Sequence, residues 1–248
     1  GKLHSRQPGD LYDVTMESLP ANWPRFSRKL RAARGEGGRI DIAARFETKR
    51  NRSFEYVQSP NSGLIELDEQ PPLIHDNDAL DIALTTAALL EAKPVSLLQT
   101  MRKTVVDGSN TSGFQRTALV ATGGKIEYEN GTIEIEQICL EEDSCRHGEN
   151  KDEYLLDRLG IPLLEITTKP QLNKPKQVQM AAKALGRLLR ACKVKRGLGT
   201  IRQDVNVSID GGERVELKGF QDLSTMSKVV ENEIIRQRNL KDLSGTKA

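Results

Sequence analysis

The residues best suited to chemistry lie in two segments that follow one another near residue 200. In TIRQDVNVSI (200–209), alternation places four polar side chains on one face of a predicted strand: Arg202, Asp204, Asn206 and Ser208. The segment RVELKGF (214–220) then places Arg214, Glu216 and Lys218 on one face of a return strand. Asp and Asn are poor strand residues, which favours a binding or catalytic wall; an ordinary solvated sheet face is the alternative.

Four more carboxylates stand in unusual settings. Glu165 lies in the apolar segment IPLLEITT (161–168), which predicts a short central strand, so its carboxylate must be protonated, paired or metal-bound. A salt bridge to Arg158 would be its simplest explanation. The acidic run 141–143 ends another predicted strand, where a solvated acidic turn is the alternative to a site.

These side chains need elements to position them, and the periodicity predicts an α+β fold. Helices are expected from Asn77 to Leu90, over 174–193 and over 224–239, with Val229 facing inward in the last. Strands are expected between 101 and 142, with a bulge where the alternation breaks at Gln137. The fold class is therefore α+β, with a largely antiparallel sheet and flanking helices.

Composition excludes several classes of protein. The 248 residues carry 37 Lys+Arg against 35 Asp+Glu, and no apolar run approaches the roughly 20 residues that a membrane span requires. Three cysteines match no zinc-ligand spacing, which predicts reduced thiols and a cytoplasmic protein. Residues 1–55 form a basic arm, in which a solvated helix over 26–33 is an alternative, and 56–248 form the core. The turn 107–110 could present hydroxyls and amides to a ligand.

Five ordered blocks resemble the B/E family of tRNA-dependent amidotransferases, and within it the archaeal E branch. They are MRKTVVDGSNTSGFQRT (101–117), QICLEEDSCR (137–146), LDRLGIPLLEITTKP (156–170), GLGTIRQDVNVSI (197–209) and RVELKGFQDL (214–223). The segment LIELDEQPP (64–72) extends the resemblance, which is weaker before Arg45.

The resemblance implies a fold, a reaction and a site. The fold is a cradle-shaped catalytic domain. ATP would phosphorylate the side-chain carboxylate of glutamate mischarged on tRNA(Gln), and ammonia would displace the phosphate to give Gln-tRNA(Gln). Family glutamates that hold Mg²⁺ match Glu141 and Glu165. The catalytic wall matches Asp204, Asn206, Glu216 and Lys218, and we add Arg202 and Ser208 on the same face as ATP-binding candidates.

The resemblance also implies partners. Ammonia would come from an asparaginase-like, ammonia-producing subunit of the D type in a hetero-oligomer, and no membrane is involved. The outer face of the helix over 174–193 carries Arg187 and Arg190, which we expect to contact tRNA phosphates; a solvated basic face is the alternative.

The sequence departs from the family pattern in two places. The family begins with a G-L-E-[IV]-H motif whose histidine faces the metal, whereas His4 stands in GKLHSRQP without the preceding glutamate. Nothing after Leu240 resembles the family's tRNA-binding domains. A catalytically inactive tRNA- or protein-binding module is therefore the second hypothesis, and a purely structural domain is the third.

Overall fold

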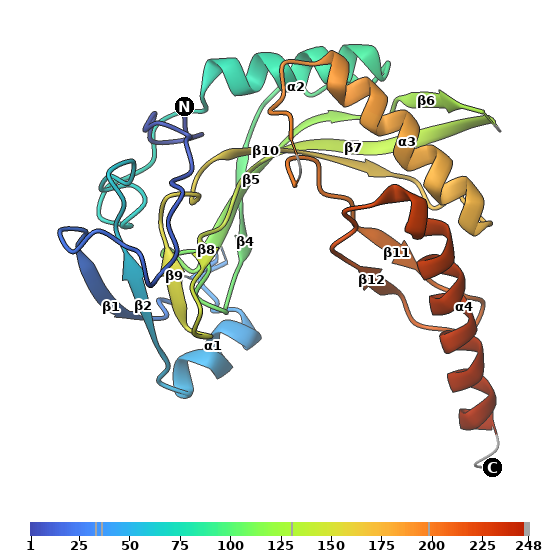
Figure 1. Cartoon of the computed structure of the whole chain (residues 1–248). Coiled ribbons are helices and arrows are strands. Elements are labelled where there is room, and N and C mark those ends of the chain that lie inside the picture. Colours follow the sequence, from blue (N-terminus) through green and yellow to red (C-terminus); the bar gives the residue numbers. More distant parts are fainter. Residues whose placement is uncertain (33, 36, 130, 198, 246–248) are drawn as a thin grey trace. The chain divides into compact units, whose positions relative to one another are not determined.

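The computed structural model describes residues 1–32, 34–35, 37–129, 131–197 and 199–245 (Figure 1). The chain divides into two compact units. Unit 1 comprises Gly1–Leu84, Pro94–Thr122 and Gln137–Ile166, and unit 2 comprises Thr85–Lys93, Gly123–Glu136 and Thr167–Ala248. The predicted arm, residues 1–55, belongs entirely to unit 1. Two residues covered by predictions, Ala33 of the alternative helix and Leu198 of a family block, lie outside the described residues.

The elements confirm the α+β class. The helices are α1 (Ile42–Lys49), α2 (Asn77–Leu89), α3 (Pro175–Ala191) and α4 (Leu223–Gly245). The first six strands are β1 (Arg25–Lys29), β2 (Ser53–Val57), β3 (Lys93–Pro94), β4 (Thr100–Thr104), β5 (Phe114–Thr122) and β6 (Lys125–Tyr128). The others are β7 (Gly131–Glu142), β8 (Arg146–His147), β9 (Glu153–Leu155), β10 (Pro162–Thr168), β11 (Val205–Val207) and β12 (Val215–Leu217). Strand β1 stands where the helix over 26–33 was the alternative.

In the part of the chain that the structure describes, the strands form three sheets that are mostly antiparallel, as predicted. One has the order β1-β2-β9-β8, in which β2 and β9 run parallel. A six-stranded sheet has the order β10-β7-β5-β3, with β4 paired to β5 and β6 paired to β7. The predicted bulge lies in the β5–β7 ladder, but the extra residue is on β5, between Leu119 and Ala121. Strands β11 and β12 form the third sheet.

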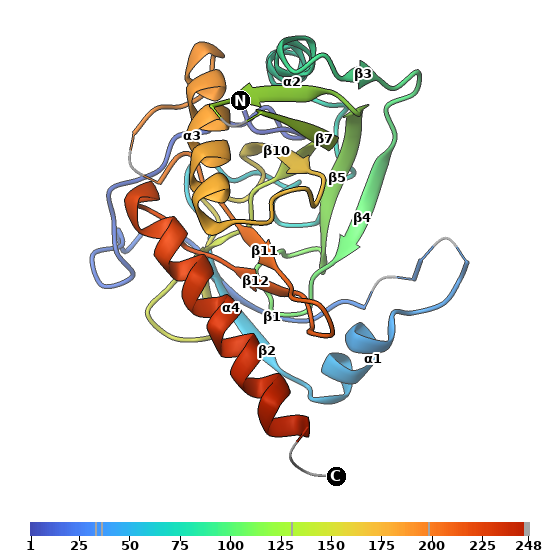
Figure 2. The ribbon, with the colours of Figure 1, turned by 90° about the vertical axis from the view of Figure 1, so that its right-hand side faces the viewer.

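Unit 2 contains the predicted hairpin and both long helices. The helices α3 and α4 pack together, and the hairpin lies against α4 in two views (Figure 1, Figure 2). The inner faces of these elements meet in one cluster, centred on Ala182, Val207, Met226 and Val230. Val229 is exposed, so its predicted inward position is wrong.

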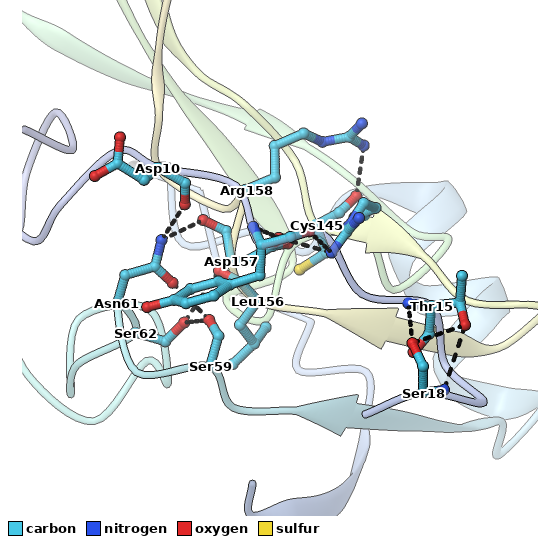
Figure 3. Close-up of polar contacts among 12 residues, drawn as sticks. Asp10, Thr15, Ser18, Ser59, Asn61, Ser62, Cys145, Leu156, Asp157 and Arg158 are labelled. Atoms are coloured by element: carbon cyan, nitrogen blue, oxygen red, sulfur yellow. Dashed lines mark hydrogen bonds and ion pairs between the residues drawn. The ribbon is translucent and has the colours of Figure 1, made fainter. Parts of the chain in front are cut away.

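Unit 1 buries the first residues of the chain. Lys2, Leu3 and His4 are all buried. The following segment is held by the Asn61 Nδ2, which donates to the carbonyl oxygens of Pro8, Asp10 and Asp157 at 3.2, 2.7 and 3.1 Å. Figure 3 shows the contacts with Asp10 and Asp157. Because three carbonyl groups meet one side-chain amide, the amino-terminal segment is fixed to the core of unit 1.

The cysteines and helices agree with two further predictions. Cys139, Cys145 and Cys192 are free and buried. Helix α2 begins as predicted near residue 77, although the side chain that caps it is Asp76, which accepts from the Ala79 amide at 3.1 Å. Among the described residues, no helix combines the length and apolar character needed to cross a membrane.

Candidate active site

Three acidic residues at the end of β7 are buried, and each faces a cation. Glu141, Glu142 and Asp143 are 7%, 4% and 4% exposed. Their partners are Lys103 at 2.8 Å, Arg116 at 3.2 Å and Arg158 at 3.6 Å. The alternative of a solvated acidic turn is therefore wrong. Cations come from β4, β5 and the segment after β9, which no local pattern connects to residues 141–143.

Glu141 is held by side chains from two neighbouring strands. Thr117 lies directly opposite it in the β5–β7 register, and the Thr117 hydroxyl donates to Glu141 Oε1 at 3.1 Å. Gln115 Nε2 donates to Glu141 Oε2 at 3.4 Å, and Lys103 is opposite Gln115 in the β4–β5 register. Since alternate residues share a face, these polar groups lie on one face of the six-stranded sheet.

Glu165 has a different environment from the one predicted. Strand β10 stands at an end of the sheet order rather than in its centre, and the Glu165 side chain is exposed. An edge strand leaves one side open to solvent, so apolar neighbours do not imply a buried carboxylate. The proposed counter-ion Arg158 instead lies by Asp143 and donates to the carbonyl oxygens of Ser144 and Cys145.

Glu165 nevertheless acts on the same groups as Glu141. Burial alone would lower the pKa of Lys103, but the hydrogen bond and charge of Glu141 and the charge of Glu165 outweigh it and raise that pKa. Burial raises the pKa of the Cys139 thiol to about 11, and the charges of Glu165 and Glu141 add to the rise. The charges of both carboxylates thus favour the protonated form of the Lys103 ammonium, and the neighbouring thiol stays protonated near neutral pH.

These donors fit a magnesium ion that keeps most of its water or phosphate ligands. Mg²⁺ prefers oxygen and is commonly bound through one or two carboxylates plus substrate phosphates. Glu141 and Glu165 supply two carboxylates, and Thr117 adds a hydroxyl beside Glu141. Within the described ranges, no group of three or more His, Cys, Asp and Glu residues could hold a metal. A site built from protein ligands alone is therefore not indicated.

The turn 107–110 is packed rather than open to a ligand. Asp107 Oδ1 accepts from the amide and the hydroxyl of Ser109 at 2.9 and 2.7 Å. The Tyr56 hydroxyl donates to the Gly108 carbonyl at 2.6 Å, and a Cβ at Gly108 would lie 2.4 Å from the Phe54 ring. Its φ of +90° also requires glycine. The turn is a structural feature of unit 1.

The hairpin in unit 2 has the predicted two-faced pattern. Arg202, Asp204, Asn206, Ser208, Glu216 and Lys218 are all exposed. Val207 is buried on the opposite face, and Asn206 lies opposite Glu216 in the register. The Lys218 Nζ lies 3.6 Å from Asp204 Oδ2 and 3.1 Å from Glu216 Oε2. The hydrogen bond that Lys218 donates to Glu216 raises the pKa of Lys218, so this ammonium stays charged.

Helix α3 also presents its predicted basic face. Lys183, Arg187 and Arg190 are exposed, while Ala181 and Ala184 are buried on the other side. The helix begins with Pro175 in its first turn, where the missing N–H costs nothing. Its polar face is therefore free of the core of unit 2 and available for phosphate contacts.

Sequence reasoning missed Lys103 and Arg116. Strand β4 is exposed along its whole length, so its residues showed no buried alternation. The available signal was that Lys103 and Arg116 both lie in the family block 101–117, although the acidic run lies in another block, 137–146. Only the register shows that Lys103, and not Arg102, shares a face with Gln115 and Thr117.

Comparison with known proteins extends this description. Residues 43–247 match the family model described as the GatB/GatE catalytic domain. The chain is 52% identical over 220 residues to the E-type subunit of glutamyl-tRNA(Gln) amidotransferase from Pyrococcus furiosus, covering 87% of this chain and 35% of that protein. It is 49% identical over 244 residues to the same subunit of Pyrococcus abyssi, covering 96% of this chain and 37% of that protein. It is 50% identical over 218 residues to that of Methanocaldococcus jannaschii, covering 86% of this chain and 35% of that protein.

The chain thus spans little more than a third of the length of these curated relatives. The match to the family model covers most of unit 2 and the sheet that carries Glu141 and Glu165. The chain belongs to the GatB/GatE catalytic-domain family.

Proposed function

We propose that this chain forms the catalytic part of an ATP-dependent amidotransferase that converts Glu-tRNA(Gln) to Gln-tRNA(Gln). Family membership supports the reaction class. The observation that carries the proposal is the buried Glu141 carboxylate, to which Lys103, Thr117 and Gln115 donate at 2.8, 3.1 and 3.4 Å from one face of the sheet. The charge of Glu165 acts on the same Lys103 ammonium. Two carboxylates and a mobile ammonium form a surface suited to a magnesium-bound nucleotide triphosphate.

The proposed reaction has two covalent steps. An oxygen of the substrate's glutamyl carboxylate attacks the γ-phosphorus of ATP, and the bond to ADP breaks. The nitrogen of ammonia then attacks the acyl carbon, and phosphate leaves with the bonding electron pair, giving the amide. Mg²⁺, bound at Glu141 and Glu165, would neutralise phosphate charge during the first step.

The residues of this chain have separate proposed roles. The Lys103 side chain is 55% exposed, so its ammonium can leave Glu141 and reach a phosphate oxygen. On the hairpin, Asp204 and Glu216 would orient the nucleotide with Arg202 and Ser208. Lys218 and Asn206 would stabilise charge that develops on the phosphoryl group and the acyl oxygen.

Substrate and partner contacts complete the proposal. The exposed Arg187 and Arg190 would bind tRNA phosphates, which positions the acceptor end without reading base identity. Ammonia would come from an asparaginase-like partner protein in a cytoplasmic hetero-oligomer.

The test uses the full-length protein with its ammonia-supplying partner. Glu141→Gln should lower the rate of Gln-tRNA(Gln) formation by about 100-fold or more, because it removes a carboxylate that would hold Mg²⁺ at the phosphates. Glu165→Gln should raise the Mg²⁺ concentration needed for half-maximal rate. Glu134→Gln is the matched control, since Glu134 lies in the same strand but pairs with Lys169 at the surface.

A second candidate is a binding module without catalytic activity. Its support is that no group of three or more His, Cys, Asp and Glu residues in the described part of the chain could hold a metal ion. ADP release that depends on Glu-tRNA(Gln) and is lost in Glu141→Gln would exclude it. Equal rates for Glu141→Gln and Glu134→Gln would instead remove the catalytic proposal.

A further inference from the structure

A basic excursion separates the two strands of the β1–β2 hairpin in unit 1. Lys29 pairs with Ser53, so the chain leaves and re-enters the sheet at the same point. Between these residues, the chain turns at Arg34 and Ile40, which form a bridge, and continues into α1. Figure 2 shows α1 to one side of strands β1 and β2. This segment plays no part in the proposed catalytic face.

The excursion carries cations that have no carboxylate partner among the described residues. Residues 30–52 contain seven Lys and Arg against three acids. Two of these acids already have partners: Asp41 caps α1 through the Ala44 amide at 3.1 Å, and Glu47 pairs with Arg50 at 2.9 Å and Arg52 at 3.5 Å. Arg31 pairs with Asp68 at 3.5 Å, outside this segment. The four cations that remain are exposed: Arg34, Arg39, Arg45 and Lys49.

One face of α1 combines these cations with apolar side chains. Ile42, Arg45, Phe46 and Lys49 follow the i, i+3, i+4, i+7 spacing of a single helix face, here called the α1 surface. This spacing normally marks the buried side of a helix. Here Ile42 is 84% and Phe46 62% exposed, whereas Ala44 on the other side is buried. Helix α1 therefore packs against unit 1 through the small Ala44 side chain, and the larger Ile42 and Phe46 side chains face solvent.

We propose that the α1 surface binds a single-stranded segment of RNA. Arg45 and Lys49 can contact successive phosphates, while the Phe46 ring offers one base a stacking surface. Protein interfaces concentrate their charges at the rim and deplete them in the core. On α1, by contrast, cations and apolar groups alternate along one face, which matches a chain of regularly spaced anions and flat bases. The inference rests on the proposed function, because a tRNA substrate supplies a single-stranded 3′ segment.

The α1 surface differs from the phosphate contacts proposed for α3. Arg187 and Arg190 lie in unit 2 on a helix whose sequence contains no aromatic residue, whereas α1 lies in unit 1 and includes Phe46. We therefore expect substitutions on the two surfaces to reduce RNA affinity in different ways. Removing α3 charges should alter only the salt-dependent part of RNA affinity, whereas Phe46 should contribute a part that salt does not screen.

The test measures RNA binding by the full-length protein without turnover. The probes are a single-stranded oligouridylate of about ten nucleotides and an RNA duplex of equal length, which is close to the range of single-strand site sizes. Arg45→Glu/Lys49→Glu should weaken binding of the single strand by about 10-fold or more and reduce the salt slope by about 1.4, for two phosphates. Phe46→Ala should weaken it by about 5- to 100-fold with the slope unchanged.

The controls separate this inference from its alternatives. Lys93→Glu/Lys151→Glu reverses two exposed charges outside the α1 surface and should leave binding of the single strand unchanged. Unchanged single-strand binding in Phe46→Ala and in the α1 charge reversal would overturn the inference, even if transamidation is intact. Loss of binding to the ammonia-supplying partner with RNA affinity unchanged would identify a protein interface instead. Absence of transamidation activity in the wild-type protein, with single-strand binding present, would count against the proposed function and not against RNA binding.

Discussion

Replacing Glu142 by methionine is expected to destabilise unit 1 by about 3–5 kcal/mol, because it leaves the Arg116 guanidinium buried without a counter-ion. The Arg116 and Glu142 side chains are only 10% and 5% exposed, so solvent screens their interaction little. Besides the ion pair, Glu142 Oε2 accepts from the Arg116 amide at 3.4 Å. The substitution therefore removes both the ion pair and this hydrogen bond from Arg116.

The double variant Arg116→Met/Glu142→Met should recover most of the lost stability. Burial raises the pKa of Glu142 although Arg116 lies beside it, so the ion pair does not compensate fully for the loss of hydration. Replacing both charges by apolar side chains of similar volume is expected to leave stability within about 1–2 kcal/mol of the original. The stability lost in the single variant therefore comes from leaving the Arg116 charge unpaired, and not from losing the ion pair itself.

Equilibrium unfolding in urea measures both effects. Trp23 is the sole tryptophan of this chain and lies in unit 1, with its ring 5.0 Å from that of Tyr12, so its fluorescence reports on that unit. For a slope of about 2 kcal/mol per molar urea, Glu142→Met should lower the midpoint by about 1.5–2.5 M. A loss below about 1 kcal/mol in the single variant, or an additive loss in the double variant, would refute the reasoning.

Three further predictions concern pH, the hairpin and α3. Because the native state holds a proton on Glu142 above the ordinary pKa of 4.5, wild type should gain stability relative to Glu142→Gln as pH falls from 7 toward 5; a constant difference in urea midpoints would contradict this. Asp204→Asn should lower kcat for Glu-tRNA(Gln) phosphorylation by about 100-fold without unfolding unit 2, since Asp204 is exposed, and Glu213→Gln serves as its control in steady-state assays. Arg187→Glu/Arg190→Glu should raise KM for Glu-tRNA(Gln) at constant kcat and flatten its salt dependence; an unchanged KM would make α3 scaffold only.

Much of the fold follows from local patterns in the sequence. The alternation in 200–209 predicted the exposed and buried faces of the hairpin, and both are present although the paired strands are shorter. The stripe on the 174–193 helix predicted which side of α3 is buried. Such patterns succeed because an element can bury only one face, and its residues alone determine which face is apolar. The inward position predicted for Val229 is wrong because helix α4 buries a narrower stripe of its surface than its apolar residues suggest.

The candidate site required the tertiary structure. The sequence by itself identified Glu141 and Glu165 as unusual and, through its motifs, the family to which they belong. It could not place Lys103 beside them, because strand register decides which residues of β4 and β5 share a face with β7. It also could not show that β10 is an edge strand, since sheet order depends on non-local pairing. The periodicity of a segment depends on its own residues, whereas charge pairing and burial depend on contacts between segments that are distant in the sequence.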